Sequence, residues 1–201
     1  MADTGAPWNI PFVEPTDLVR DYPAADEAQA LAVAAGLTAA GNAGIGSNVA
    51  STVKTNAFQT SSTSPQDVTG LAVTITPTTP TSKILVIAQV STSGVAGSAD
   101  STYLRVNGGN MQTFIGDADG SRTRATSFRR RQASVHESDM DSFAVTMIYL
   151  SSPETTSPLT FQVQSWVGAG GTASINRSGI DTNNVTYGRT ASSITAIEVA
   201  A

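Results

Sequence analysis

The pattern of apolar and polar positions changes near residue 41. From there onward, short β-branched runs are separated by clusters of Gly, Ser, Thr, Pro and Asn. Residues 71–76 and 161–164 alternate strictly between apolar and polar side chains, which predicts half-buried strands. The nearly continuous apolar run 83–88 predicts a central strand that is buried on both faces. The predicted strands are 49–58, 68–76, 83–92, 101–106, 111–116, 142–150, 159–168, 172–176 and 192–199.

Eight or nine strands at this spacing predict a mainly β fold, an antiparallel β-sandwich or jelly roll over residues 42–201. The turn residues 107–110, Asn-Gly-Gly-Asn, predict a hairpin between strands 101–106 and 111–116. Strands and helices do not alternate along the chain, which argues against an α/β nucleotide-binding fold.

Residues 1–22 are predicted to form an extended arm. Its prolines recur every four residues, at Pro7, Pro11 and Pro15, and each one disfavours a helix. In an extended segment, the large apolar side chains of Trp8, Ile10 and Phe12 share one side. Because so short an arm cannot bury them on itself, we expect it to dock on a partner chain. An arm folded back on its own domain is the alternative.

Residues 23–41 are predicted to contain a short Ala-rich helix. Pro23 suits the first turn, and the carboxylates of Asp26 and Glu27 lie where they complement the helix dipole. Small apolar side chains fall on one stripe, formed by Ala28, Leu31, Ala32 and Ala35. Such a stripe buries little area alone, so we expect the helix to bundle with its own copies. A helix lying on the parent domain is the alternative.

The charge of −5 is concentrated in the first 40 residues, which hold six acidic residues and one arginine. The remainder of the chain is neutral, so copies of it repel one another little. An isoelectric point near 4.7 argues against general affinity for nucleic acid. The chain has no cysteine, which excludes disulfides, thiolate metal sites and a cysteine nucleophile. No apolar run approaches a membrane span, so no membrane insertion is expected.

A basic stretch is the most prominent charge feature of the β-rich region. It contains Arg122, Arg124, Arg129, Arg130 and Arg131, followed by His136 and the acidic residues Glu137, Asp139 and Asp141. A nucleic-acid patch lacks supporting aromatics, and contact with an anionic glycan or phosphate is a second reading. We favour pairing with an acidic stretch of the same chain or of a neighbour. Residues 107–141 are the predicted exposed binding face.

Candidate catalytic and metal-binding groups are sparse, and we expect neither an enzyme nor a cofactor. His136 is the only histidine and no GxSxG elbow is present, so nucleophilic catalysis and a multi-histidine metal site are not predicted. Asp117 and Asp119 resemble part of a calcium loop, but the required Gly and Glu are replaced by Arg122 and Phe128. A turn explains them more simply. Carboxylate pairs for glycan cleavage are available, as in any loop-rich chain.

Residues 5–41 resemble the N-terminal segment of short structural proteins of tailed bacteriophages, the minor tail or tail-fibre proteins. Residues 64–86, 115–126 and 175–199 are similar to a β-rich domain that recurs in phage fibres. The resemblance implies a virion component, commonly a homotrimer, with an N-terminal attachment segment and an outward β-domain. For a chain of 201 residues, we expect neither the long shaft nor the large distal domain of many fibres, which leaves room for a compact decoration or head-fibre role.

We therefore expect a non-enzymatic virion structural protein, a tail-fibre or minor tail component that associates with other phage structural proteins. A capsid-decoration or head-fibre protein, anchored to the shell by the same arm, is the first alternative. A glycan-binding module, with a host-surface glycan as partner, is the second. That module requires exposed aromatic residues, for which Tyr103, Phe128 and Tyr187 are the candidates.

Overall fold

The computed structural model describes residues 2–3, 11–12, 27–36, 48–95, 101–109, 114–130 and 142–199. The chain divides into two compact units, Met1–Ser47 and Asn48–Val199. In the first unit, β1 (Ala2–Asp3) pairs antiparallel with β2 (Pro11–Phe12), and residues 27–36 form a helix. This helix lies within the predicted range 23–41, and the two ends of that range lie outside the described residues. No helix in the described part of the chain is long and apolar enough to span a membrane.

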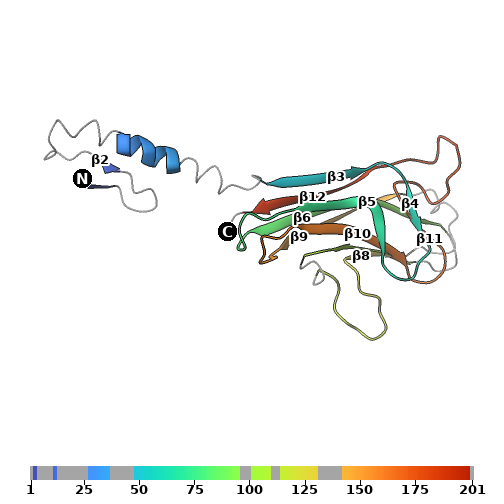
Figure 1. Ribbon diagram of the computed structural model, residues 1–201. Helices are drawn as coiled ribbons and strands as arrows, with labels where there is room; N and C mark the ends of the chain where they lie inside the picture. The colour runs from blue at the N-terminus through green and yellow to red at the C-terminus, as the bar shows by residue number, and fades with distance from the viewer. Residues whose placement is uncertain are drawn as a thin grey trace. The chain divides into compact units, whose positions relative to one another are not determined.

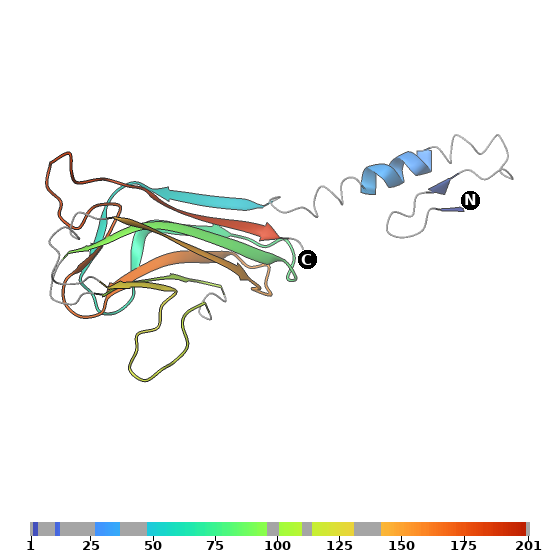
Figure 2. The same cartoon turned by 180° about the vertical axis from the view of Figure 1, so that it is seen from behind.

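The second unit is a sandwich of two antiparallel sheets (Figures 1 and 2), which confirms the predicted fold class. One sheet has the order β5 (Gln66–Ile75), β10 (Leu159–Val167), β7 (Ser101–Asn107) and β8 (Ser127–Arg130). The other has the order β3 (Val49–Lys54), β12 (Ser192–Val199), β6 (Lys83–Val95), β11 (Thr172–Ile175) and β4 (Phe58–Thr60), and β9 (Phe143–Ser151) pairs with β6. Successive strands cross repeatedly between the sheets, as in a jelly roll.

The core lies between the two sheets and is built from alternate residues of their strands. The largest fully buried side chains include Leu71, Leu104 and Phe161 from one sheet and Ile84 and Ile194 from the other. Burying each such side chain contributes about 1.5–3 kcal/mol. Because side chains alternate along a strand, the opposite faces of both sheets carry the positions that can bind partners.

Strand β6 differs from its prediction on one face. Ile84, Val86 and Ala88 are fully buried in the core, whereas Leu85 and Ile87 on the other face are only half-buried. The continuous apolar run therefore does not mark a strand covered on both sides. It marks a central strand whose outer face remains accessible in the single chain.

The predicted strand 111–116 is wrong where the structure describes it, and the hairpin that leads into it stays a prediction. Residues 114–116 are not a strand, and residues 110–113 lie outside the described residues. Strand β7 pairs instead with β8, which the sequence pattern did not reveal. The apolar side chain of Phe114 stacks on Tyr149 of β9, with 5.0 Å between ring centroids, so it closes the end of the core rather than extending a strand. The predicted strand 49–58 is divided between β3 and β4.

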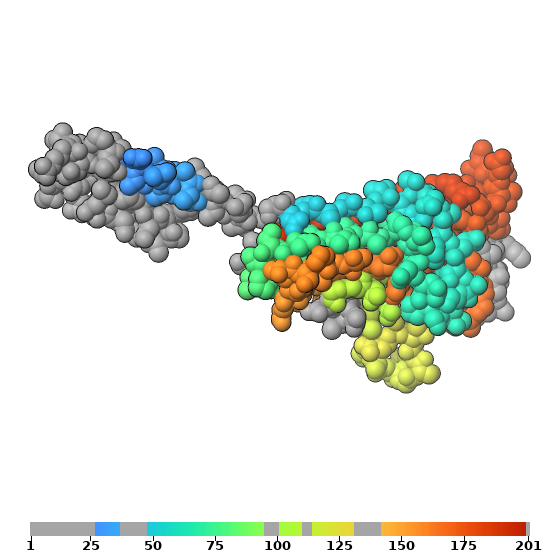
Figure 3. Space-filling view, viewed as in Figure 1, coloured from blue at the N-terminus to red at the C-terminus, as the bar shows by residue number. Residues whose placement is uncertain are grey.

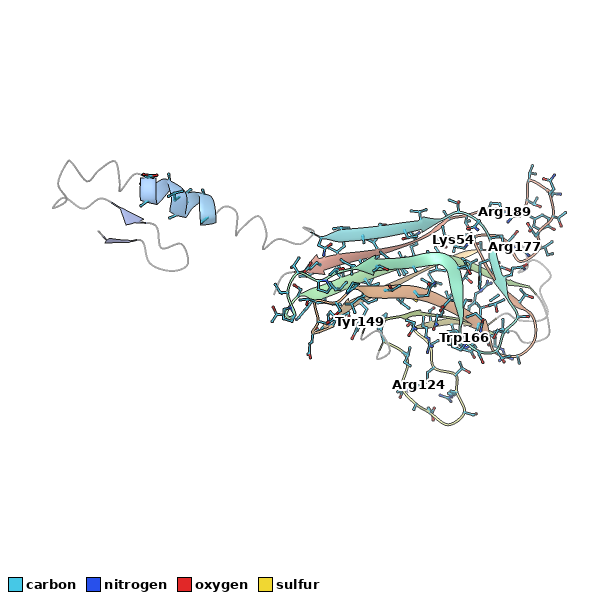
Figure 4. The ribbon with its side chains drawn as sticks, in the orientation of Figure 1. Lys54, Arg124, Tyr149, Trp166, Arg177 and Arg189 are labelled. Carbon is cyan, nitrogen blue, oxygen red and sulfur yellow. The ribbon has the colours of Figure 1, made fainter. Side chains whose placement is uncertain are left out.

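The sandwich has two distinct ends. The unit begins at Asn48 beside the C-terminal end of β12, and Glu198 N–H donates to Asn48 O at 2.9 Å. The loop between β11 and β12, residues 176–191, lies at the opposite end, because Ser192 at the start of β12 pairs with Lys54 at the end of β3. Figure 4 shows Lys54, Arg177 and Arg189 together at that end.

Candidate functional site

The loop that precedes β8 projects from the sandwich, where Figure 3 shows it in yellow and Figure 4 labels its Arg124. Hydrogen bonds hold its two limbs together: Gly116 N–H donates to Ala125 O at 3.1 Å, and Arg124 Nε donates to Gly116 O at 2.6 Å. The turn at its tip uses Gly120, whose φ of 56° lies in the left-handed region. These hydrogen bonds fix the backbone of the loop and the side chain of Arg124.

A cleft of about 250 Å³ lies between this loop and the start of β8. Its lining residues are Gly116, Asp117, Asp119, Arg122, Thr123, Arg124, Ala125, Thr126, Ser127 and Phe128. Arg122 and Asp119 form an exposed ion pair at 2.7 Å. Two carboxylates and two guanidinium groups make the lining formally neutral, and the hydroxyl groups of three residues add further hydrogen-bonding capacity.

An aromatic row crosses the outer face of the four-stranded sheet and ends at this cleft. Trp166, Tyr103 and Phe128 pair across β10, β7 and β8. The Tyr103 ring stacks on Trp166 with 5.4 Å between centroids and on Phe128 with 6.0 Å. Trp166 is 2% exposed and Phe128 is 66% exposed. The row therefore presents one accessible aromatic ring at the edge strand β8.

A row of polar side chains lies beside the aromatic row. Gln164 Nε2 donates to Asp67 Oδ1 at 2.7 Å, and Arg105 Nε donates to Gln164 Oε1 at 2.7 Å. The Arg105 guanidinium carbon also lies 5.6 Å from the centroid of the Trp166 ring. These contacts position Arg105 and help to hold Trp166 in place.

The structure separates the arginines of the predicted basic stretch. Arg122 and Arg124 line the cleft, whereas Arg129 and Arg130 point to opposite faces of β8. The Arg129 guanidinium carbon lies 3.5 Å from the centroid of the Phe143 ring. Arg131, His136 and the acidic residues Glu137, Asp139 and Asp141 lie outside the described residues. The favoured pairing of these two stretches therefore stays a prediction, and the observed partner of Arg122 is Asp119.

The outer face of the six-stranded sheet carries two cross-strand rows of mostly apolar side chains, which we call the apolar sheet face. The first row is Val49, Ile197, Leu85 and Leu150, and the second is Ser51, Thr195, Ile87 and Ile148. Val49, Ile148 and Leu150 are 52%, 55% and 44% exposed. Large apolar groups gathered on one accessible face mark an interaction surface.

The 176–191 loop forms a third accessible surface. Asp181 accepts hydrogen bonds from both Arg177 and Arg189, and an isolated bridge pairs these two arginines in the backbone. A depression of about 380 Å³ lies beside them and is lined by Asp181, Thr182, Asn183, Asn184, Tyr187 and Arg189. Its Tyr187 is half-buried and is not one of the three stacked rings of the aromatic row.

The predicted N-terminal sites remain predictions. Pro7, Trp8, Ile10 and Pro15 lie outside the described residues, and Pro11 and Phe12 form β2. In the helix, Leu31 is 64% exposed, Ala35 is exposed, and Ala28 and Ala32 are half-buried. Within the described residues, no group of three or more His, Cys, Asp or Glu is placed to hold a metal ion.

No protein-family model matches the chain, and no curated protein matches its sequence. Among solved structures, the chain is similar to Eiger TNF from S. frugiperda, with 14% sequence identity and a TM-score of 0.36. The similarity covers 76% of this chain and 92% of that one. The fold class stated above rests on the strand order and register of this chain itself.

Of the aromatic candidates named from the sequence, the structure brings Tyr103 and Phe128 into one row and leaves Tyr187 out of it; Trp166 was missed, although it had a signal. Strict alternation over residues 161–164, continued by position, places Trp166 on the same face as Gln162 and Gln164, which is the outer face. That Tyr103 and Phe128 share a row with Trp166 had no such signal, because it depends on the pairing of β7 with both β10 and β8.

Proposed function

We propose that the chain is a non-enzymatic structural protein of a tailed-bacteriophage virion, a tail-fibre or minor tail component that assembles as a homotrimer. In this proposal, the N-terminal arm attaches to the particle and the β-sandwich faces outward. The observation that carries the proposal is the apolar sheet face, which a single copy leaves accessible to water. The resemblance of residues 5–41 to phage attachment segments supplies the virion context.

Several features of the sandwich support an assembly role. A row of apolar side chains that crosses four neighbouring strands, from Val49 to Leu150, makes a continuous surface rather than a scatter of single residues. The neutral charge of residues 41–201 removes the electrostatic barrier to bringing copies together. A second copy is therefore the occupant that we assign to this face.

Immunoelectron microscopy of the intact virions tests the location. An antibody against residues 114–130 recognises the projecting loop, which lies at the surface of the sandwich. Label at the tail tip or baseplate is the result that we expect. Label spread over the head would replace the tail assignment with the capsid-decoration alternative, and particles without label would contradict a virion role altogether. Antibody binding to the purified chain is the positive control.

A further inference from the structure

The accessible ring of Phe128 is held in a fixed position by the rows around it. One side of the ring faces Tyr103, whose other neighbour in the row is the buried Trp166. Trp166 in turn lies beside Arg105, which Gln164 and Asp67 restrain. An aromatic side chain that is two-thirds exposed and yet anchored through its neighbours offers a ligand a preorganised apolar platform.

The cleft supplies directional polar groups on the same side as this platform. Asp117 and Thr123 are exposed in the loop, and Ser127 precedes Phe128 at the start of β8. Arg124 uses Nε to bind Gly116 O, which orients its guanidinium group within the lining. A carboxylate, which can accept from two neighbouring hydroxyl groups, and a guanidinium group, which can donate to two, thus lie near an apolar ring.

This combination of groups matches a sugar ring. A pyranose has one C–H-rich face, which packs on an aromatic ring, and a rim of hydroxyl groups, which requires both donors and acceptors. The formally neutral lining favours an uncharged sugar over a sulfated or sialylated one. Single-stranded nucleic acid also stacks on aromatic rings, but its phosphates require a positively charged groove, which the formally neutral cleft does not supply.

We infer that the cleft between the 114–126 loop and β8 binds an uncharged hexose or hexosamine unit of a glycan, with Phe128 as the stacking platform. Asp117 and Arg124 bind the hydroxyl groups of that unit. Only the source of the sugar, a glycan of the host surface, rests on the proposed virion function. Binding by the purified chain is independent of where the chain sits in a particle, so the two proposals fail separately.

The test is binding of the purified full chain to an array of neutral, sialylated and sulfated glycans, followed by calorimetric titration of the strongest binder. Single-stranded oligonucleotides are titrated in parallel. We expect millimolar to micromolar affinity for a neutral glycan. Phe128→Ala should weaken binding about tenfold, since it removes the stacking contact. Phe128→Trp should retain the affinity, and Asp117→Asn should reduce it severalfold.

Matched variants separate the cleft from general surface effects. Val185→Ala removes another exposed apolar side chain, and Glu154→Gln neutralises an exposed carboxylate in a different loop; neither should change the affinity. Unchanged binding by Phe128→Ala would overturn the inference, as would the absence of any bound neutral glycan. Preference for a charged glycan or for an oligonucleotide would overturn the assigned ligand class. Circular dichroism of each variant confirms that the fold is retained.

Discussion

At the scale of single residues, Glu198 combines burial with several hydrogen bonds to one carboxylate. Its side chain is buried, and its carboxylate accepts hydrogen bonds from Asn48 Nδ2 at 2.8 Å, Thr78 N at 2.8 Å and Thr78 Oγ1 at 2.6 Å. Burial raises the pKa, but these hydrogen bonds and one from Ser82 outweigh it and lower the pKa from 4.5 to about 2. Glu198 thereby joins the beginning of the sandwich unit to the 76–82 loop.

The depressed pKa of Glu198 predicts a pH-dependent stability. Because the folded pKa lies below the unfolded one, the ionised carboxylate stabilises the fold above pH 4.5 and loses this effect as the pH falls toward 2. Urea unfolding should show the stability decreasing across that window. Glu198→Gln should lower the free energy of unfolding at pH 7 by about 1–3 kcal/mol and flatten the acid dependence.

The exposed Glu154 is the control for the acid titration. Glu154→Gln should leave both the stability at pH 7 and the slope between pH 4.5 and 2 close to those of the wild type. Equal acid slopes for Glu198→Gln and the wild type would show that other carboxylates carry the effect.

At the scale of elements, the turn after β7 depends on a glycine. Gly108 has a φ of 121°, and a Cβ at this position would lie 2.0 Å from Thr160 O on the neighbouring strand β10. The close approach lets β7 remain paired with β10 up to Asn107, which pairs with Gln162. The same pairing places Tyr103 beside Trp166, so the turn helps to set the register of the aromatic row.

Gly108→Ala is therefore expected to destabilise the fold by at least about 2 kcal/mol, because backbone strain and a clash with Thr160 add together. Thermal and urea unfolding measure the effect. Gly188→Ala is the matched control, since no atom lies within 4 Å of a Cβ there and its φ is not left-handed. It should change the stability by less than about 0.5 kcal/mol. Equal stabilities for the two variants would show that β10 moves away without cost.

At the scale of the whole molecule, the apolar sheet face and the helix are both candidates for contacts between copies. The sheet face offers three large exposed apolar groups, Val49, Ile148 and Leu150, in rows continued by the half-buried Leu85, Ile87 and Ile197, whereas the helix offers Leu31 and Val33 among alanines. We expect the sheet face to contribute most of the association free energy, because that free energy rises with the apolar area removed from water. In the proposed trimer, we expect the helix to set how the N-terminal segments of the copies align.

Sedimentation experiments test this arrangement. The wild-type chain should sediment at three times its mass of 20.6 kDa at micromolar concentration. Ile148→Glu should weaken association at least about tenfold, since a buried unpaired carboxylate replaces apolar contact. Val185→Glu, which changes a fully exposed loop residue, should leave the assembly intact.

Two further outcomes are informative for the assembly model. Leu31→Glu should weaken association less than Ile148→Glu does; the reverse order would assign the main contact to the helix. A wild-type chain that sediments as a monomer at these concentrations would contradict the homotrimer.

Much of the fold follows from local patterns in the sequence. Alternation and turn residues predicted the strands near 66–75, 83–95, 159–167 and 192–199 and, through their number and spacing, an antiparallel sandwich. Alanine content predicted the helix in the region where residues 27–36 form one. These predictions succeed because strand and helix periodicities are properties of neighbouring residues, which the chain order shows directly.

Only the tertiary structure decided which strands are neighbours. The short charged strand β8 has no apolar alternation, and it exists because it pairs with β7 at the edge of the sheet. That pairing brings Phe128 next to Tyr103, which lies 25 positions away in the chain, and the pairing of β7 with β10 brings Trp166, 63 positions away, to the other side of Tyr103. The sequence by itself determined the sandwich and its alternating faces. The aromatic row, the cleft and the continuity of the apolar sheet face required long-range register, which local composition does not encode.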